Sequence, residues 1–474
     1  MTTDEQAIRR ELAAHGQEQV LRLWGRLDEA GRARLLGQLA GLDWDALDAW
    51  IRDSVLHATA FRLPADMEPA PFLPRWPRNA AEAAAYRKAE ARGRELLRAG
   101  RVAGFTVAGG QGTRLGYDGP KGTFPISPVR GKPLFQLFAE SLGRVAEKYG
   151  HPVPWIIMTS PLNHDATREH FGRNAWYGLE PGTVSFVTQG TMPAFGFDGK
   201  LLLAAPDSLA LSPDGHGGSL LALRRSGTLE RLAAQGIEHI TYWQVDNPLA
   251  QPFDPLFLGL HDLTGSEMSC RSLTKADPLE KLGHFALSGG RTVVIEYSDM
   301  PSALMHARGP AGGLVYQAGS PAMHILGRRF VERLTADGRL HLPWHRAVKK
   351  VPCVGPDGEP VSPTEPNGVK LERFIFDALP LARNVLILEA ERAECFAPVK
   401  DPSGPDSAAT CRERLSARAA AWLEAAGIPV PRRPDGRPDA VIELSPRRFL
   451  DAEDVQAQAA GLRAPRPGAQ EYYA

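Results

Sequence analysis

The chain has 474 residues, and its 55 Lys plus Arg balance its 55 Asp plus Glu, so the formal net charge is zero. At about 150 residues per domain, this length predicts two or three domains. The charge balance provides no broad positive field for holding nucleic acid or an anionic membrane, so we expect neither as a partner.

The sequence shows no signal for secretion or for insertion into a membrane. The N-terminal stretch MTTDEQAIRRELAAHG lacks the continuous apolar core of a signal peptide, and no later stretch reaches the length of a membrane span. Cys270, Cys353, Cys395 and Cys411 are scattered without a CxxC pair, which favours reduced thiols. We therefore expect a soluble, cytoplasmic protein.

Three composition regimes follow along the chain. Residues 5–53 show amphipathic helical patterns, residues 63–79 are proline-rich and predict an extended strap, and residues 80–97 have high helix propensity. We assign 1–97 to an N-terminal helical segment and strap. Residues 98–395 form the predicted central domain, and 396–474 form a small C-terminal lobe with one helical pattern at 407–426.

The middle regime alternates apolar strand-like runs with helical patterns. Such alternation predicts an α/β fold, a doubly wound and mainly parallel sheet flanked by helices. Ligands of such sheets bind at the carboxyl ends of the strands. The predicted strands are 101–107, 154–160, 183–189, 239–246 and 292–298, and the predicted helices are 134–147, 164–171 and 219–236.

A glycine-dense loop, AGGQGTRLGYDGPKG, follows the first of these strands. Gly109, Gly110 and Gly112 allow positive backbone torsions and close approach, so that peptide N–H groups can converge on phosphate oxygens. Arg114 and Lys121 add positive charge, and the combination predicts a nucleoside triphosphate site. A glycine-rich turn without a ligand is the alternative.

Two familiar phosphate motifs do not fit this loop. A P-loop lysine is followed by Ser or Thr, whereas Gly122 follows Lys121. Leu115 occupies the position of the third glycine of the dinucleotide fingerprint, which disfavours a nicotinamide-dependent oxidoreductase.

Other polar residues stand at or after predicted strand ends. Asp246 is a candidate magnesium ligand; a helix N-cap is its alternative, but Asp254-Pro255 is the better start for the next helix. The run SPDGHGGS places glycines and His216 before a helix, where backbone donors attract anions. No partner that would make His216 a general base is evident. Taken singly, Lys370 and Lys400 read as solvated surface lysines.

Taken together and in order, the motifs resemble those of the UDP-N-acetylhexosamine pyrophosphorylases and the eukaryotic-type UDP-sugar and UDP-glucose pyrophosphorylases. The segments that carry the resemblance are GGQGTRLG, PKG, IIMTS, TQGTMPAFGFDGK, SPDGHGG, QVDN, VIEYSD, YQAGS, PNGVKLERFIFDAL and FAPVKDPSGPDS. The resemblance implies a Rossmann-like nucleotidyltransferase core.

It also implies roles for particular residues. The loop, with Gly109, Gly110, Gly112 and Thr113, would hold the UTP phosphates, and Arg114, Lys121 and Lys400 would be the catalytic cations. The implied nucleotide contacts further include Gln189, Gly215 and His216, of which Gln189 and Gly215 face the uracil. Asp246 would bind Mg²⁺, and the implied sugar contacts are Gly283, Glu296, Ser320 and Lys370.

The resemblance implies uridylyl transfer from UTP to a sugar 1-phosphate, with UDP-sugar and pyrophosphate as products. N-acetylglucosamine 1-phosphate is the expected sugar substrate. The chain has DGHGG and AGS where proteins acting on N-acetylhexosamine phosphate usually have DGNGG and AGN. A glucose 1-phosphate or broad UDP-sugar pyrophosphorylase therefore stays open, as does a non-catalytic nucleotide-sugar-binding protein.

Overall fold

A computed structural model describes residues 4–57 and 61–474, which divide into two compact units. The first unit draws on the ranges 1–62, 189–219 and 340–377, and the second on 63–188, 220–339 and 378–474. These units cut across the predicted division into 1–97, 98–395 and 396–474, which stays a prediction about the organisation of the sequence.

The first unit packs three N-terminal helices on short strands from two later segments. Apolar side chains of the helices, such as Leu12 and Leu35, share one core with Phe195 and Leu371. This burial explains the amphipathic pattern of residues 5–53. Its elements are α1 (Glu5–Ala14), α2 (Glu29–Ala40), α3 (Trp44–Trp50), β5 (Thr191–Pro193), β6 (Phe195–Gly196), β7 (Leu203–Ala205), β8 (Ser208–Leu209), β9 (Leu211–Pro213), β16 (His345–Lys349), β17 (Cys353–Val354), β18 (Pro360–Val361) and β19 (Gly368–Glu372).

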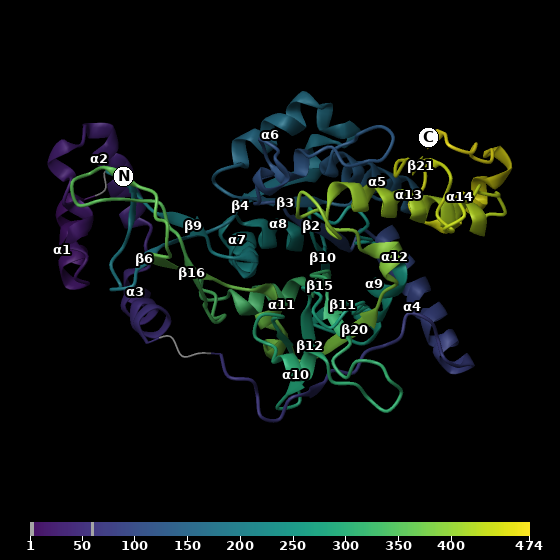
Figure 1. The fold of residues 1–474 in the computed structure, drawn as a ribbon, viewed down its shortest axis with the longest axis horizontal. Coiled ribbons are helices and arrows are strands. Elements are labelled where there is room, and N and C mark those ends of the chain that lie inside the picture. The colour runs from purple at the N-terminus through teal and green to yellow at the C-terminus, as the bar shows by residue number, and fades with distance from the viewer. Residues whose placement is uncertain (1–3, 58–60) are drawn as a thin grey trace. The chain divides into compact units, whose positions relative to one another are not determined.

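The second unit is built on a large sheet with the strand order β1-β12-β14-β11-β15-β10-β2-β3-β4. Figure 1 labels β4, β3, β2, β10, β15, β11 and β12 of this sheet. In addition, β13 pairs with β12, and β20 pairs with β11. The strands are β1 (Glu68–Pro69), β2 (Val102–Val107), β3 (Trp155–Thr159), β4 (Val184–Thr188), β10 (His239–Gln244), β11 (Met268–Thr274), β12 (Gly283–Ser288), β13 (Arg291–Ile295), β14 (Ala318–Ser320), β15 (His324–Gly327) and β20 (Val385–Glu389).

The α/β prediction is confirmed, and the parallel strands are gathered in one half of the sheet. The β10–β2, β2–β3 and β3–β4 pairs are parallel, as is the β11–β20 pair. The pairs of β15 with β10 and β11, and those of β14 with β11 and β12, are antiparallel. The predicted strand at 292–298 forms β13, an antiparallel partner of β12.

The helices predicted at 134–147, 164–171 and 219–236 are present in this unit. The predicted helix 219–236 is two helices, because Gly227 between them has a φ of +67°. The strap places β1 against β12, and Leu73 bonds to Ile387 and Glu389. The helices are α4 (Ala80–Arg98), α5 (Leu134–Tyr149), α6 (His164–Arg173), α7 (Ser219–Arg225), α8 (Thr228–Ala234), α9 (Pro255–Leu263), α10 (Ser302–Met305), α11 (Arg328–Leu334), α12 (Arg392–Cys395), α13 (Ala408–Ala425) and α14 (Ala452–Gln458).

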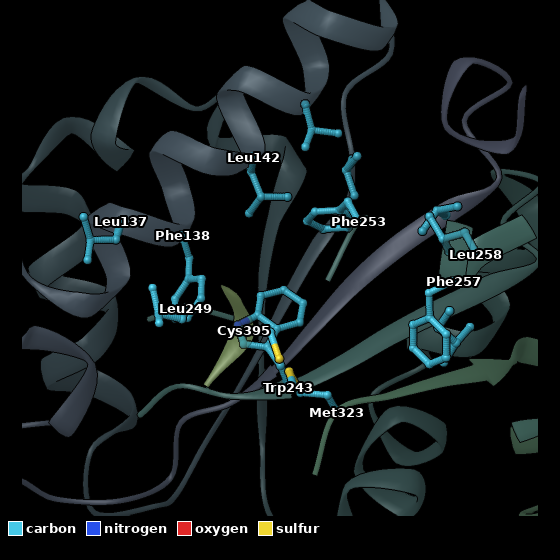
Figure 2. Packing of buried hydrophobic residues seen from close by; sticks show 14 of the residues in the cluster. Leu137, Phe138, Leu142, Trp243, Leu249, Phe253, Phe257, Leu258, Met323 and Cys395 are labelled. Carbon is cyan, nitrogen blue, oxygen red and sulfur yellow. The ribbon is translucent and has the colours of Figure 1, made fainter. Parts of the chain in front are cut away.

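The core of the second unit lies between α5 and the parallel strands. Figure 2 shows Leu137, Phe138 and Leu142 of α5 on the side of Trp243 and Phe253. The ring centroids of Phe138 and Trp243 are 5.5 Å apart, within the range of favourable aromatic contacts. This packing holds the carboxyl ends of β2 and β10 in place.

Two glycines let α4 and α9 touch backbone to backbone. A Cβ on Gly93 would lie 1.9 Å from the Pro255 oxygen, and one on Gly259 would lie 1.6 Å from the Ala89 oxygen. Any larger residue would force the helices apart.

The C-terminal residues add a smaller cluster with its own apolar core. Leu423 of α13, Ile442 and Val455 are buried together there. Ile442 lies on β21 (Val441–Leu444), which pairs in parallel with β22 (Gln470–Tyr473). Across 4–57 and 61–474, every helix is too short or too polar to cross a membrane.

Candidate active site

The glycine-rich loop leaves β2 at Val107 and is closed on itself by backbone hydrogen bonds. Lys121 N–H donates to the Gly110 oxygen at 3.0 Å, and Gly112 N–H donates to the Gly119 oxygen at 2.9 Å. The Asn163 side chain, 1% exposed, donates to the oxygens of Ala108 and Gly110 at 3.0 and 3.2 Å. Because their partners are fixed, the loop carbonyls point inward and the loop keeps one shape.

The first three loop glycines do not use the positive torsions that glycine allows. Gly109, Gly110 and Gly112 all lie in the described part of the chain, and none has a positive φ; such angles occur at Gly116 and Gly119 instead. Gly112 is required for another reason, since its Cβ would lie 2.7 Å from the Tyr117 ring. A Cβ on Gly110 would have nothing within 4 Å, so the space above it is open.

Lys121 and Asp246 meet at the carboxyl end of the parallel strands. β10 pairs with β2 up to Gln244 and Val107, so Asp246 emerges beside the loop. The Lys121 Nζ and an Asp246 carboxylate oxygen are 3.3 Å apart, and the two side chains are 15% and 13% exposed. Asp246 has no capping duty, because Asp254 accepts from Leu256 N–H at the start of α9.

Asp246 suits a magnesium ion that keeps most of its waters. Mg²⁺ is commonly bound through one or two carboxylates plus substrate phosphates. Asp246 offers a partly exposed carboxylate at the mouth of the loop. Among the described residues, Asp246 is not part of a cluster of metal-binding side chains. Within those ranges such a cluster lies at Glu238, His239 and Asp262. Asp246 would therefore need phosphate oxygens to complete a magnesium site.

Lys400 reaches the same strand ends through its backbone. Val399 N–H donates to the Asp246 oxygen at 2.9 Å, and Lys400 N–H donates to the Asp406 oxygen at 2.7 Å. Burial raises the pKa of the Asp406 carboxyl, and the charge of Lys400 partly offsets this. Thr113 and Arg114 lie on the loop with exposed side chains, open to a ligand.

Three predicted sugar residues come together on the antiparallel half of the sheet. Gly283 on β12 pairs in register with Ser320 on β14. A Cβ on Gly283 would lie 3.5 Å from a carboxylate oxygen of Glu296, which follows β13. The structure thus gathers Gly283, Glu296 and Ser320 around one point of close backbone approach.

The other predicted contacts belong to the first unit. The Gln189 side-chain amide donates to the Gly215 oxygen at 2.8 Å. Gly215 has a φ of +84°, and its Cβ would lie 2.3 Å from the Arg373 oxygen, so only glycine fits. Lys370 lies on β19 opposite Ala347 of β16, and no described contact ties its side chain to this group.

His216 is held as a neutral ring. Its Nδ1 accepts from Ile375 N–H at 3.1 Å, and its ring stacks on Phe374 with centroids 5.2 Å apart. Burial, with a smaller contribution from His345, lowers the pKa of His216 to about 4. A neutral His216 whose Nδ1 is already engaged is a positioning group rather than a base.

Most of the chain is similar to known proteins. The model of the UTP–glucose-1-phosphate uridylyltransferase family matches residues 77–458. UDP-N-acetylhexosamine pyrophosphorylase-like protein 1 of Homo sapiens is 34% identical over 482 residues, which cover 96% of this chain and 95% of the human protein. The chain belongs to this family.

Two further proteins are similar to this member of the uridylyltransferase family. The UDP-N-acetylglucosamine pyrophosphorylase of Saccharomyces cerevisiae is 36% identical over 345 residues, covering 71% of this chain and 72% of the yeast protein. The crystal structure of the uridine diphosphate N-acetylglucosamine pyrophosphorylase from Trypanosoma brucei matches with a TM-score of 0.83 and 24% identity, covering 100% of this chain and 98% of that one. This structural likeness confirms the fold.

Three polar residues near the predicted site were not predicted from the sequence. Asn163 holds the loop from the end of β3, Asp406 accepts from Lys400, and Asp214 is a buried carboxylate of the DGHGG motif. A Cβ on Gly218 would lie 2.2 Å from the Asp214 carboxylate, which explains that glycine. The strand-end rule could have found Asn163, since it stands four residues after Thr159.

Proposed function

We propose that this protein is a uridylyltransferase that forms UDP-sugar and pyrophosphate from UTP and a sugar 1-phosphate. One observation carries the proposal: the loop glycines, Lys121, Asp246 and the Lys400 segment converge at the carboxyl ends of β2 and β10. Family membership supports the same chemistry.

The reaction would be a single in-line displacement. An oxygen of the sugar phosphate attacks the α-phosphorus of UTP, the bond to the bridging oxygen breaks, and pyrophosphate leaves with its electrons. The attacking phosphate is already anionic near neutral pH, so the protein needs no general base. Its work is positioning and charge neutralisation.

Each residue has a defined task in this scheme. Lys121, Arg114 and Lys400 would neutralise phosphate oxygens, and backbone N–H groups near Gly110 would approach them closely. A magnesium ion, when bound through Asp246, would neutralise charge on the phosphates. Lys121 lies 3.3 Å from Asp246, so both charges would act at one place.

Gln189 and Gly215 are the proposed contacts to the base. The Gln189 amide and the Gly215 backbone can pair with the donor and acceptors of uracil. The fixed hydrogen bond between them supports this role, because a prearranged group loses less freedom when it binds.

We propose N-acetylglucosamine 1-phosphate as the sugar substrate, with glucose 1-phosphate as the alternative. The names of the human and yeast relatives support the acetylated sugar. Ser320 instead of an asparagine at AGS leaves a shorter side chain beside Gly283, and a water could replace the missing amide. The cysteines form no disulfide in the described residues, which supports a cytoplasmic enzyme.

Pyrophosphate release tests the proposal. The purified protein is given UTP and Mg²⁺ with N-acetylglucosamine 1-phosphate, glucose 1-phosphate or galactose 1-phosphate. Release with the acetylated sugar at the highest kcat/KM is expected. A higher value with glucose 1-phosphate would transfer the assignment to that sugar, and binding of UTP without any release would leave only a nucleotide-sugar-binding protein.

A further inference from the structure

A cavity lies within the second unit, and none of the predicted site residues lines it. Its volume is about 410 Å³, and α5, α13 and the C-terminal cluster contribute most of its wall. Such a volume falls in the range of small-molecule sites. Apolar side chains dominate the lining, among them Leu137, Phe253, Leu415, Trp422, Phe449 and Leu450.

Arg418 brings a positive charge into this apolar cavity. Its guanidinium lies 4.7 Å from the Trp422 ring centroid, and its Nη1 donates to the Glu394 and Leu249 oxygens at 3.0 and 3.4 Å. No described carboxylate lies within ion-pair distance, and its Nε and Nη2 have no described partner. Loss of solvation lowers the pKa of Arg418 to about 10, so the group is charged at neutral pH.

Several other charges around the cavity are already matched. Arg94 pairs with Glu90 at 3.0 Å and with Glu453 at 2.9 Å. A carboxylate oxygen of Glu443 accepts from two backbone N–H groups of the 129–130 turn, each at 2.8 Å. Arg75 and Arg418 line the cavity without a described ion pair; the Arg75 guanidinium lies over the exposed Trp76 ring, whereas Arg418 belongs to the wall formed by α13.

The remaining carboxylates limit what could pair with it. Glu391 and Glu394 line the same cavity, and Glu394 accepts from Trp422 Nε1 at 2.9 Å. These carboxylates would repel a phosphate or a nucleotide with two or more negative charges. One carboxylate can form a bidentate pair with Nε and Nη2 of an arginine.

We propose that this cavity is a second ligand site, one that takes a small monocarboxylate with an aromatic or branched apolar body. The carboxylate would bond to Arg418, and the body would lie among Leu137, Phe253 and Phe449. Offsetting an unpaired charge and burying apolar surface both favour such a ligand.

The cavity wall and the proposed phosphate site share two segments of the chain. Arg418 bonds to the segments that follow Asp246 and precede Lys400. Between them, Asn247 donates to the Cys395 oxygen at 2.8 Å and accepts from Ala397 N–H at 2.9 Å. A ligand on Arg418 would therefore change the rate of turnover, a consequence that rests on the proposed function.

Calorimetric titration of the full-length protein tests the site without using activity. The probes are 3-phenylpropionate and its neutral analogue 3-phenylpropanol. We expect the carboxylate to bind at least about tenfold tighter, which corresponds to about 1.4 kcal/mol. Equal affinities, or no binding of the carboxylate at millimolar concentration, would overturn the proposal.

Two variants of α13 locate the binding. Ala421 is exposed and lines the cavity, so Ala421→Leu should fill it and weaken carboxylate binding at least about tenfold. Ala417, one turn earlier, is exposed and does not line the cavity, so Ala417→Leu should bind like the wild type. Unchanged binding by Ala421→Leu would place the probe elsewhere and refute the site.

A third variant tests the charge. Arg418→Met should bind both probes equally, and retained preference for the carboxylate would contradict the role of Arg418. If it does not fold, Ala421→Leu still decides the location. Because binding is read directly, a protein that lacks turnover but binds 3-phenylpropionate would refute the proposed function and leave the second site standing.

Discussion

Lys121 forms an ion pair with Asp246 and is a proposed catalytic cation, and Lys121→Met tests both its effect on stability and its effect on turnover. At 3.3 Å and an effective dielectric constant of about 20, the Coulomb attraction is about 5 kcal/mol. Desolvation of both groups offsets most of this, so we expect a loss of about 1–2 kcal/mol in the free energy of unfolding without magnesium.

The loss in turnover should be larger. A cation that neutralises charge in the transition state contributes about 3–4 kcal/mol, so Lys121→Met should lower kcat by about 10² to 10³. The double variant Lys121→Met/Asp246→Asn no longer leaves an uncompensated carboxylate. It should regain part of the stability and none of the turnover.

Two assays follow these changes. Urea denaturation measures the free energy of unfolding, and pyrophosphate release at saturating UTP and sugar 1-phosphate measures kcat. Lys88→Met, on the exposed face of α4, is the matched control and should behave like the wild type. A folded Lys121→Met protein with kcat within twofold of the wild type would refute the reasoning.

Three further predictions test other residues. Gly110→Ala adds a Cβ into open space, so thermal stability should hold, while KM for UTP should rise about tenfold if the phosphates bind at that backbone as proposed. Ser320→Ala should change the ratio of kcat/KM for acetylated and plain glucose 1-phosphate by about 3- to 10-fold, measured in competition. The lowered pKa of His216 favours folding fully above pH 6.5, and this stability is lost as the pH falls toward 4. His216→Asn keeps an acceptor for Ile375, so between pH 7 and 4 it should lose about 2 kcal/mol less than the wild type in denaturant titrations.

Each of these has a contrary outcome. A fall in the melting temperature of Gly110→Ala would mean that the space above the loop is filled. An unchanged sugar ratio in Ser320→Ala would remove Ser320 from the sugar site. Parallel pH curves for His216→Asn and the wild type would mean that folding does not lower the pKa of His216.

The strand ends are the part of the site that sequence could predict. Short apolar runs bounded by glycine and proline place β2, β3, β4 and β10 within two residues of their observed ends. Because these strands are parallel, their carboxyl ends share an edge, and the meeting of Lys121 with Asp246 follows from that rule.

Contacts between distant segments could not be predicted in the same way. The antiparallel pairings of β14 with β12 and of β15 with β10 depend on neighbouring strands rather than on periodicity. The sequence of a short strand does not specify which strand it pairs with. The positive torsions at Gly116 and Gly119 could not be located from the sequence either, because sequence shows that glycine permits a positive φ and not where one occurs.

The first unit imposes an order on biosynthesis. Leu12 and Leu35 share their core with Phe195 and Leu371, so the N-terminal helices leave the ribosome long before the strands that cover them. Until residue 371 is made, the apolar stripes of these helices must face water or a chaperone. Destabilising either helix should therefore reduce the yield of newly made protein more than it reduces the stability of protein that has already folded.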